Sequence, residues 1–170
     1  RDYKVTGVQT CALPIWSILR ESVKAIEVLS KYNISAEVWS ATSFNLLRKD
    51  GMEVERENRL NPTKEAKTPY VTEQFSDSDI PIIASTDYMR SYAEQIRPYI
   101  DSEYYVLGTD GYGRSDSRES LRSFFEIDAK NIAATAAYAL FKKGDIDKKE
   151  VNKIYKDLGI DASKPNPWEV

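Results

Sequence analysis

Charged side chains and glycines gather in one stretch of the sequence, residues 106–119. Three glycines fall within six positions there, and glycine adopts positive φ without steric cost, so the stretch predicts a tight, shaped turn. Such a turn can hold carboxylates, a guanidinium and a hydroxyl in fixed positions, as the binding of a ligand or a partner surface requires. The candidate functional or interface residues are Asp110, Gly111, Arg114, Ser115 and Asp116.

The elements around this turn predict where it lies in the fold. Residues 103–107 are rich in aromatic and branched side chains, which are typical of a β-strand. Asp116 is followed three residues later by Glu119, as in a capping box, so a helix is expected to begin there. A turn between strand and helix lies beyond the carboxyl end of the strand, where open α/β sheets bind ligands and partners.

A purely structural interpretation of the same residues stays open. Asp110 could only satisfy backbone N–H groups of the turn, and Asp116 could only cap the helix. Arg114 lies between these two aspartates, and its planar guanidinium is expected to form bidentate bonds that fix the turn. The glycine spacing matches neither the dinucleotide fingerprint nor a P-loop, which argues against a nucleotide-binding domain.

The composition excludes several kinds of chemistry. The 170 residues include no histidine and one cysteine, Cys11, which excludes histidine-dependent triads, most zinc sites and an internal disulfide. No carboxylate spacing matches an EF-hand, and we expect no catalytic, cofactor-binding or metal-binding residue in this chain. A net charge of −3 and the lack of a long apolar run argue against nucleic-acid and membrane partners. The single cysteine fits a reducing compartment, so a cytoplasmic location is expected.

Apolar periodicity predicts alternating helices and strands from Ser17 onward. The expected strands are 34–40, 70–74, 81–85 and 103–107. The expected helices are 17–31 with Glu21 on its polar face, 43–48 ended by Gly51, 87–97, one from 116, one from 128 to Gly144 and one from 147 to Gly159. Residues 52–79 are expected to be mainly a solvated connection, and Trp168 is expected to anchor the tail against the body of the domain or against a partner. This order predicts a mostly parallel sheet with helices on both faces.

Residues 1–16 differ from the rest of the sequence. They show neither helical nor alternating periodicity, Pro14 interrupts their only apolar cluster, and they lack the pattern of a secretory signal. The run 5–15 looks like a translated sequencing adapter, and proline is excluded from central strands. We therefore expect residues 1–16 to be a non-native segment outside the fold and residues 17–170 to form the domain.

Several motifs carry a resemblance to a known enzyme family. They are Ser17–Glu21 (SILRE), Val38–Phe44 (VWSATSF), Ala84–Met89 (ASTDYM), Leu107–Asp116 (LGTDGYGRSD) and Asn166–Pro167 (NP). From Ser17 to Val170 the chain resembles the C-terminal domain of the homodimeric, bacterial-type first component of the pyruvate dehydrogenase complex, in the transketolase-like superfamily. The resemblance implies a three-layer α/β/α sandwich with a mostly parallel sheet.

The resemblance also implies a function for a complete parent enzyme, of which this chain would be about the last fifth. Such a parent decarboxylates pyruvate on thiamine diphosphate and magnesium, and transfers the acetyl group to a lipoyl group of the dihydrolipoyl acetyltransferase subunit. The family holds both cofactors in its other two domains, through a Gly-Asp-Gly signature and paired asparagines that this chain lacks. The isolated chain is therefore expected to bind no cofactor and to be inactive, while it contributes dimer contacts and the mouth of the active site.

The region before Ser17 departs from the family. The family has a glycine-rich strand end before its first helix, whereas this chain has Ile15-Trp16-Ser17, so the first strand of the domain is expected to be lost. A function from a different class also stays open, namely a free-standing interaction module of the same fold without chemistry of its own.

Overall fold

The centre of the structure is a four-stranded parallel sheet. The computed structural model describes residues 8–14, 16–76 and 79–170. Its strands lie in the order β2-β1-β3-β4, with the bounds β1 Val8–Pro14, β2 Ile34–Val38, β3 Ile82–Ser85 and β4 Tyr104–Leu107. Every neighbouring pair is parallel, so the four carboxyl ends meet at one edge of the sheet.

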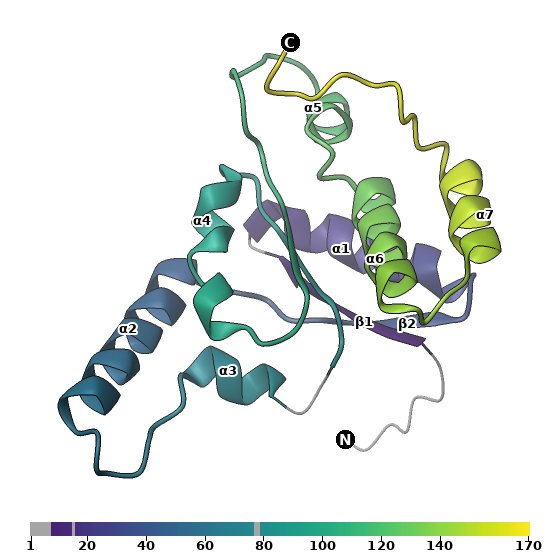
Figure 1. The fold of residues 1–170 in the computed structure, drawn as a ribbon. Helices are drawn as coiled ribbons and strands as arrows, with labels where there is room; N and C mark the ends of the chain where they lie inside the picture. The colour runs from purple at the N-terminus through teal and green to yellow at the C-terminus, as the bar shows by residue number, and fades with distance from the viewer. Residues whose placement is uncertain (1–7, 15, 77–78) are drawn as a thin grey trace.

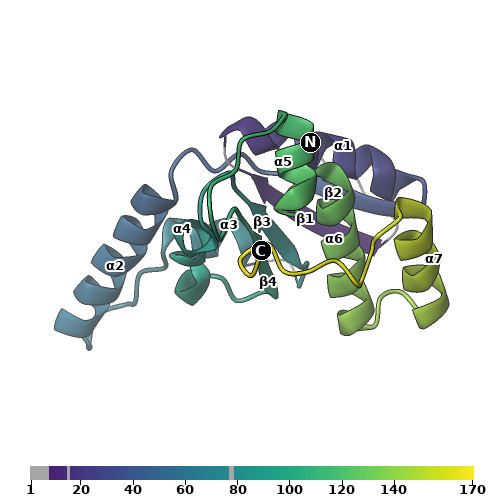
Figure 2. The same cartoon turned by 90° about the horizontal axis from the view of Figure 1, so that it is seen from above.

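Helices cover both faces of this sheet (Figure 1, Figure 2). One face carries α1 (Leu19–Ser30), α6 (Ala129–Lys143) and α7 (Lys148–Leu158), and the other carries α2 (Phe44–Leu60), α3 (Tyr70–Phe75) and α4 (Arg90–Glu94). Helix α5 (Arg118–Phe124) lies beyond the carboxyl edge, and 3-10 helices span Trp16–Ile18 and Arg97–Tyr99. The expected three-layer α/β/α sandwich is confirmed.

The alternation of side chains along the strands divides the core into two halves. On β3, Ile82 and Ala84 pack in the cluster beneath α2, α3 and α4, whereas Ile83 packs in the cluster beneath α1, α6 and α7. None of the three is more than 1% exposed. The strand is buried on both faces, which explains its continuous apolar sequence.

Strand β1 corrects the expectation that residues 1–16 lie outside the fold. Val8–Pro14 lies in the middle of the sheet, between β2 and β3, and its side chains include the buried Cys11 and Leu13. The first strand of the domain is therefore present. Residues 1–7 lie outside the described residues, and the foreign origin of the adapter-like run stays a prediction.

The position of Pro14 explains why the proline rule gave the wrong result. Pro14 is the last residue of β1, where it is opposite Ser85 of β3. Its carbonyl oxygen still accepts a hydrogen bond from the N–H of Ala41, at 3.1 Å. A proline at the end of a strand removes one donor without interrupting the ladder before it.

Helix α2 is longer than expected. It begins after Ser43, its N-cap, close to the expected start, and it continues through Gly51 to Leu60. Gly51 is buried, and a Cβ at this position would lie 2.5 Å from Cε2 of Tyr99. The glycine therefore allows the helix to pack closely against an aromatic ring, and it does not end the helix.

Two other expected elements also differ. Residues 70–74 are helical, because Val71 and Phe75 lie one turn apart in α3 and are both buried. The helix expected over 87–97 is reduced to α4, followed by the 3-10 turn at Arg97–Tyr99. Among the described residues after Ser17 there are three strands, where four were expected.

The last two helices end where the sequence predicts. Asp128 caps α6, and Gly144 closes it with a φ of +93°. Asp147, where α7 is expected to begin, forms a reciprocal capping box with Glu150, with donor–acceptor distances of 2.7 and 3.1 Å. Gly159 then closes α7 in the left-handed region.

Candidate functional site

Three loops meet beyond the carboxyl ends of β1, β3 and β4. Ser17, which follows β1, donates from Oγ to Oδ2 of Asp87, which follows β3, at 2.7 Å. Thr109, which follows β4, donates from its hydroxyl to the Asp87 carbonyl at 3.1 Å and from its N–H to the Tyr88 carbonyl at 2.8 Å. These bonds join the loops into one surface, at the edge where parallel sheets carry binding sites.

Two glycines of the predicted turn are required by close packing. A Cβ on Gly108 would lie 2.7 Å from the carbonyl oxygen of Tyr88. Gly111 has a φ of +107°, and a Cβ there would lie 2.9 Å from the carbonyl oxygen of Pro167 in the C-terminal tail. Gly113, in contrast, has open space around it. The tight, shaped turn is thus confirmed, with the tail as one of its walls.

The turn is tied to helix α4 through Asp110. Its Oδ1 accepts a hydrogen bond from the N–H of Arg90, the first residue of α4, at 2.9 Å. This agrees with the structural interpretation of Asp110 as an acceptor for backbone N–H groups. The carboxylate therefore has a positioning role between two loops of the carboxyl edge.

Arg114 does not form the expected bidentate bonds to the aspartates. Its Cζ lies 4.2 Å from the centre of the Phe124 ring, so the guanidinium stacks on an aromatic face of α5. Within the described part of the chain it has no carboxylate partner. The prediction failed because α5 folds back toward the turn and offers Phe124 as a nearer surface.

Helix α5 begins one residue later than the capping box predicts. Ser117, not Asp116, is the N-cap, and its Oγ accepts from the N–H of Ser120 at 3.2 Å. Asp116 accepts from the N–H of Ser117 at 2.6 Å. Ser115 is exposed and has no hydrogen bond to another described residue. The five candidate residues thus share one turn but do not form one ion-paired cluster.

A buried carboxylate that the sequence did not single out holds the base of the site. Glu21 of α1 has a side chain that is 8% exposed, and its Oε1 pairs with Lys24 and Arg122, each at 3.0 Å. Its Oε2 accepts from the N–H of Ala129, the first residue of α6, at 3.1 Å. Arg122 also donates to the carbonyl of Ser17 at 3.2 Å. Glu21 therefore joins α1, α5 and α6.

The ionisation of Glu21 reflects this set of partners. Burial raises its pKa, but the hydrogen bonds from Lys24 and from Ala129 N–H, with the charges of Lys24 and Arg122, outweigh burial and leave the pKa below its ordinary value. The sequence held one signal of this role. Glu21, Ala25 and Leu29 follow one another at intervals of four residues, and all three are buried. Glu21 therefore lies on the apolar stripe of α1.

A pocket of about 420 Å³ opens between the turn and α5. It is bounded by residues from all three loops and from α5, and its charged side chains are one aspartate and three arginines. Its lining comprises Ser17, Ile18, Asp87, Thr109, Gly111, Tyr112, Gly113, Arg114, Arg118, Leu121, Arg122, Phe125 and Ile127. Two of the five predicted residues, Gly111 and Arg114, lie in it.

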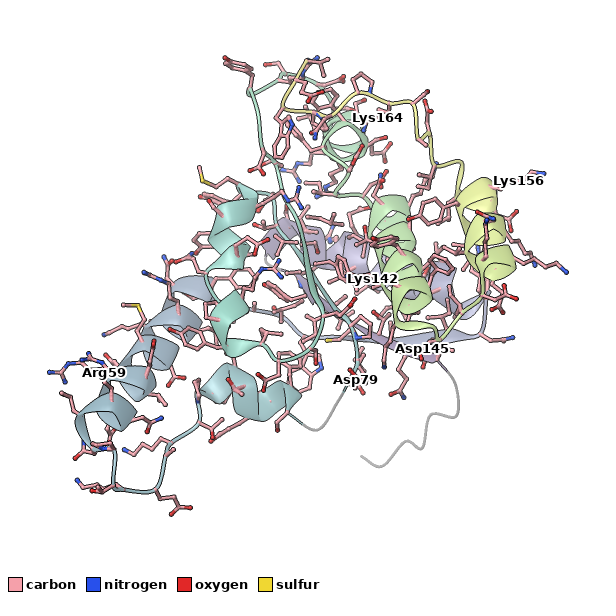
Figure 3. All side chains as sticks on the ribbon, in the orientation of Figure 1. Arg59, Asp79, Lys142, Asp145, Lys156 and Lys164 are labelled. Carbon is pink, nitrogen blue, oxygen red and sulfur yellow. The ribbon has the colours of Figure 1, made fainter. Side chains whose placement is uncertain are left out.

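The C-terminal tail crosses the same edge (Figure 3). Lys164 donates from Nζ to the carbonyls of Ser123 and Phe124 at 2.8 and 2.7 Å, and it pairs with Glu126 at 3.2 Å. The tail is thus held at the carboxyl end of α5 by a lysine. The expected anchor, Trp168, keeps 51% of its surface exposed.

The described residues offer little for metal, thiol or membrane chemistry. No group of three or more His, Cys, Asp or Glu side chains among them could hold a metal ion. Burial, reinforced by Glu37, raises the pKa of the Cys11 thiol to about 12, so it stays protonated at neutral pH. Across the same residues, no helix has the length and apolarity to cross a membrane.

Comparison with known proteins places this fold in a family. The model of the transketolase-like TK C-terminal domain matches residues 14–128, more than half of the chain. The chain belongs to this family. A solved structure, a split-gene transketolase described as an inactive beta4 tetramer, agrees in fold with a TM-score of 0.51 over 79% of this chain and 40% of its own, at 12% identity.

Curated relatives are much closer in sequence. The pyruvate dehydrogenase E1 component of Pseudomonas aeruginosa is 51% identical over 155 residues, which are 90% of this chain and 18% of the relative. The pyruvate dehydrogenase E1 component of Escherichia coli K12 is 47% identical over 153 residues, which are 89% of this chain and 17% of the relative. This transketolase-like C-terminal domain therefore spans less than a fifth of these relatives.

Proposed function

We propose that this chain is the C-terminal domain of a pyruvate dehydrogenase E1 component. The parent enzyme would decarboxylate pyruvate oxidatively and transfer the acetyl group to a lipoyl group. The observation that carries the proposal is the 51% identity over 90% of the chain with a protein of that name. A match over 90% of the chain includes both the turn and α5, so it is not confined to one motif.

Within the parent, the domain would contribute dimer contacts and part of the mouth of the active site. Its turn is suited to such a role, because residues 111–117 are exposed and Gly111 allows the positive φ that the shape of the turn requires. Asp110 fixes the base of the turn, which leaves Arg114 and Ser115 turned to the solvent side of the edge. These side chains would orient a substrate or a partner surface; none of them would act as a nucleophile.

Thiamine diphosphate and magnesium would be supplied by the rest of the parent enzyme. The donor set of this chain does not fit them, because the described residues lack a cluster of carboxylates for a divalent cation. Three of the four charged side chains that line the pocket at the carboxyl edge are arginines, which repel magnesium. We therefore assign no step of the cofactor chemistry to this chain.

The partners of the parent follow from the same proposal. It would be a homodimer that delivers acetyl groups to the dihydrolipoyl acetyltransferase subunit, in the cytoplasm of a bacterium. The competing function is a free-standing interaction module with the same fold, which would need neither a parent enzyme nor pyruvate.

A domain exchange tests the proposal. The segment of the E. coli K12 relative that aligns with this chain would be replaced by this chain, and pyruvate-dependent acetylation of a lipoyl domain would be measured. We expect the hybrid to form dimers and to keep its rate within about tenfold, because about half of the residues are identical. The matched control carries the corresponding domain of the split-gene transketolase, 12% identical to this chain, and is expected to lose the reaction.

The two functions give different outcomes in this exchange. A hybrid that folds and dimerises but cannot acetylate the lipoyl domain would contradict the proposal and favour the interaction module. In the hybrid, Arg114→Lys and Arg114→Ala are expected to weaken dimer assembly or lower the rate with thiamine diphosphate still bound. Arg59→Lys, at the outer end of α2, is the matched control. Wild-type behaviour of both Arg114 variants would remove the turn from the proposed site.

A further inference from the structure

The pocket between the turn and α5 contains two arginines that have no carboxylate partner among the described residues. Arg118 has no ion pair with another described residue, and Arg114 contacts only the ring of Phe124. Stacking covers a face of the Arg114 guanidinium, whereas its N–H donors point outward in the plane of the group. Both side chains therefore present charged donors without an acceptor from the described chain.

The other two charged side chains of the pocket, Arg122 and Asp87, each have a polar partner. Arg122 is neutralised by Glu21, and it donates a second bond to a backbone carbonyl. Asp87 accepts from Ser17 through Oδ2 and is the single acidic side chain of the lining. Two unpaired positive charges thus face one partly satisfied negative charge, so the pocket attracts an anion.

The floor of the pocket is apolar. Ile18 is fully buried, Ile127 is 2% exposed, and Leu121 and Phe125 are half-buried beside them. The volume of about 420 Å³ lies within the range of small-molecule sites in proteins, about 300–1,000 Å³. A few charged groups above an apolar floor are the usual composition of such sites.

We propose that this pocket binds a small organic anion, in which a phosphate or carboxylate group is attached to an apolar body. The oxyanion would accept charge-assisted hydrogen bonds from Arg114 and Arg118. The apolar body would lie on the half-buried side chains of Leu121 and Phe125, beneath which Ile18 is packed. This site would be a ligand site of the C-terminal domain itself, separate from the cofactor chemistry proposed for the parent.

Three probe molecules separate the binding of the oxyanion from the packing of the apolar body. Phenyl phosphate, benzoate and inorganic phosphate would each be titrated into the 170-residue chain, with binding followed by calorimetry and by the NMR signals of the arginine side chains. We expect phenyl phosphate to bind at least about fivefold more tightly than inorganic phosphate, because its ring buries apolar surface. Benzoate distinguishes a preference for carboxylate from one for phosphate. Pyruvate is absent from these titrations, so their result does not depend on the proposed enzyme function.

Charge variants provide the decisive comparison. Arg118→Gln and Arg114→Gln are expected to weaken phenyl phosphate binding by about tenfold each, since each removes a charged donor. Asp87→Asn is expected to strengthen it, because the repelling charge is lost while the amide oxygen can still accept from Ser17. The matched control is Arg59→Gln, which lies at the outer end of α2, away from α5 (Figure 3), and is expected to have no effect.

Several outcomes would overturn the proposal. Failure of all three probes to saturate, or equal affinities for phenyl phosphate and inorganic phosphate, would show that the pocket is not a site for an organic anion. Equal losses in the Arg118→Gln and Arg59→Gln variants would show a diffuse effect of net charge. Arg118 is exposed, so its variant is expected to fold, and the thermal melting of each variant verifies this.

Discussion

Arg122 of α5 donates to the carboxylate of Glu21 of α1 at 3.0 Å, across 101 positions of the sequence. Both side chains are largely shielded from water, with 17% and 8% of their surfaces exposed. Because Glu21 also accepts from the first N–H of α6, this pair determines where α5, and therefore the floor of the pocket, lies relative to the sheet.

Glu21→Gln is expected to lower the free energy of unfolding by about 2–3 kcal/mol at pH 7, because it leaves Arg122 without its charged partner in a shielded position. Urea denaturation followed by circular dichroism measures this loss. Lys24→Met is the matched control, since Lys24 contacts the same carboxylate but is 60% exposed, and it is expected to cost less than about 1 kcal/mol. Equal losses in both variants would contradict the special role of the Arg122 pair.

The contribution of Glu21 is also expected to depend on pH. Its pKa in the fold lies below the ordinary value of 4.5, so its stabilising effect is fully present above that value and is lost as the pH falls through the folded pKa. The stability difference between the wild type and Glu21→Gln should therefore be constant between about pH 6 and 7 and should shrink below about pH 4.5. If the stability difference between the two proteins instead grew as the pH fell, the prediction would be contradicted.

Cys11 reports on strand β1. The thiol is 6% exposed and its pKa is raised to about 12, so we expect the native chain to react with a thiol reagent only after unfolding in urea. The matched control is Ser115→Cys, whose exposed thiol in the turn should react within seconds while Cys11 stays protected. Rapid reaction of Cys11 in the native chain would place residues 8–14 outside the sheet.

Gly51→Ala tests why α2 continues through a glycine. Alanine favours a helix by about 0.5–1 kcal/mol, but here its Cβ would meet the Tyr99 ring, so a net loss of about 1 kcal/mol is expected. In a Tyr99→Ala background the same change should become stabilising. Thermal melting of the wild type, the two single variants and the double variant completes a double-mutant cycle. The absence of coupling between the two changes would show that the ring does not constrain this position.

Gly111→Ala is expected to release the C-terminal tail. The residue has a φ of +107° and would place a Cβ 2.9 Å from the carbonyl oxygen of Pro167, so strain and contact act together. Hydrogen exchange of tail peptides, measured by mass spectrometry, should become faster. Gly113→Ala, with open space around it, is the matched control and should exchange like the wild type.

Local signals in the sequence predicted those parts of the fold that depend on neighbouring residues. The caps at Asp128 and Asp147 and the left-handed glycines at 144 and 159 involve bonds within a few residues, and all were placed correctly. The order of helices and strands predicted the layered architecture, because alternating helices and strands can bury their apolar faces in only a few arrangements.

The errors arose where distant segments decide the structure. Gly51 continues a helix because Tyr99 lies against it, and Pro14 belongs to a central strand because it stands at the strand's last position. Arg114 meets Phe124 in place of the aspartates, since the path of α5 brings the ring to it. Glu21 was assigned to the polar face because its charge concealed its place on the apolar stripe. The turn was found correctly, but the pocket was not, because its floor comes from the 3-10 turn before α1, from α5 and from residues just after α5.

Because all strands of the sheet are parallel, its two edges differ, and this determines at which end of the chain a fusion partner can be attached. Strand β1 begins at Val8 on the amino edge, whereas the turn and the tail lie on the carboxyl edge (Figure 1). The pocket, which is lined by residues of the turn, lies on the carboxyl edge too. A fluorescent protein or a sensor surface joined ahead of Val8 would therefore leave the pocket open to solvent. The same object joined after Val170 would sit beside the turn, where Gly111 contacts the tail, and would be the wrong choice for any binding assay.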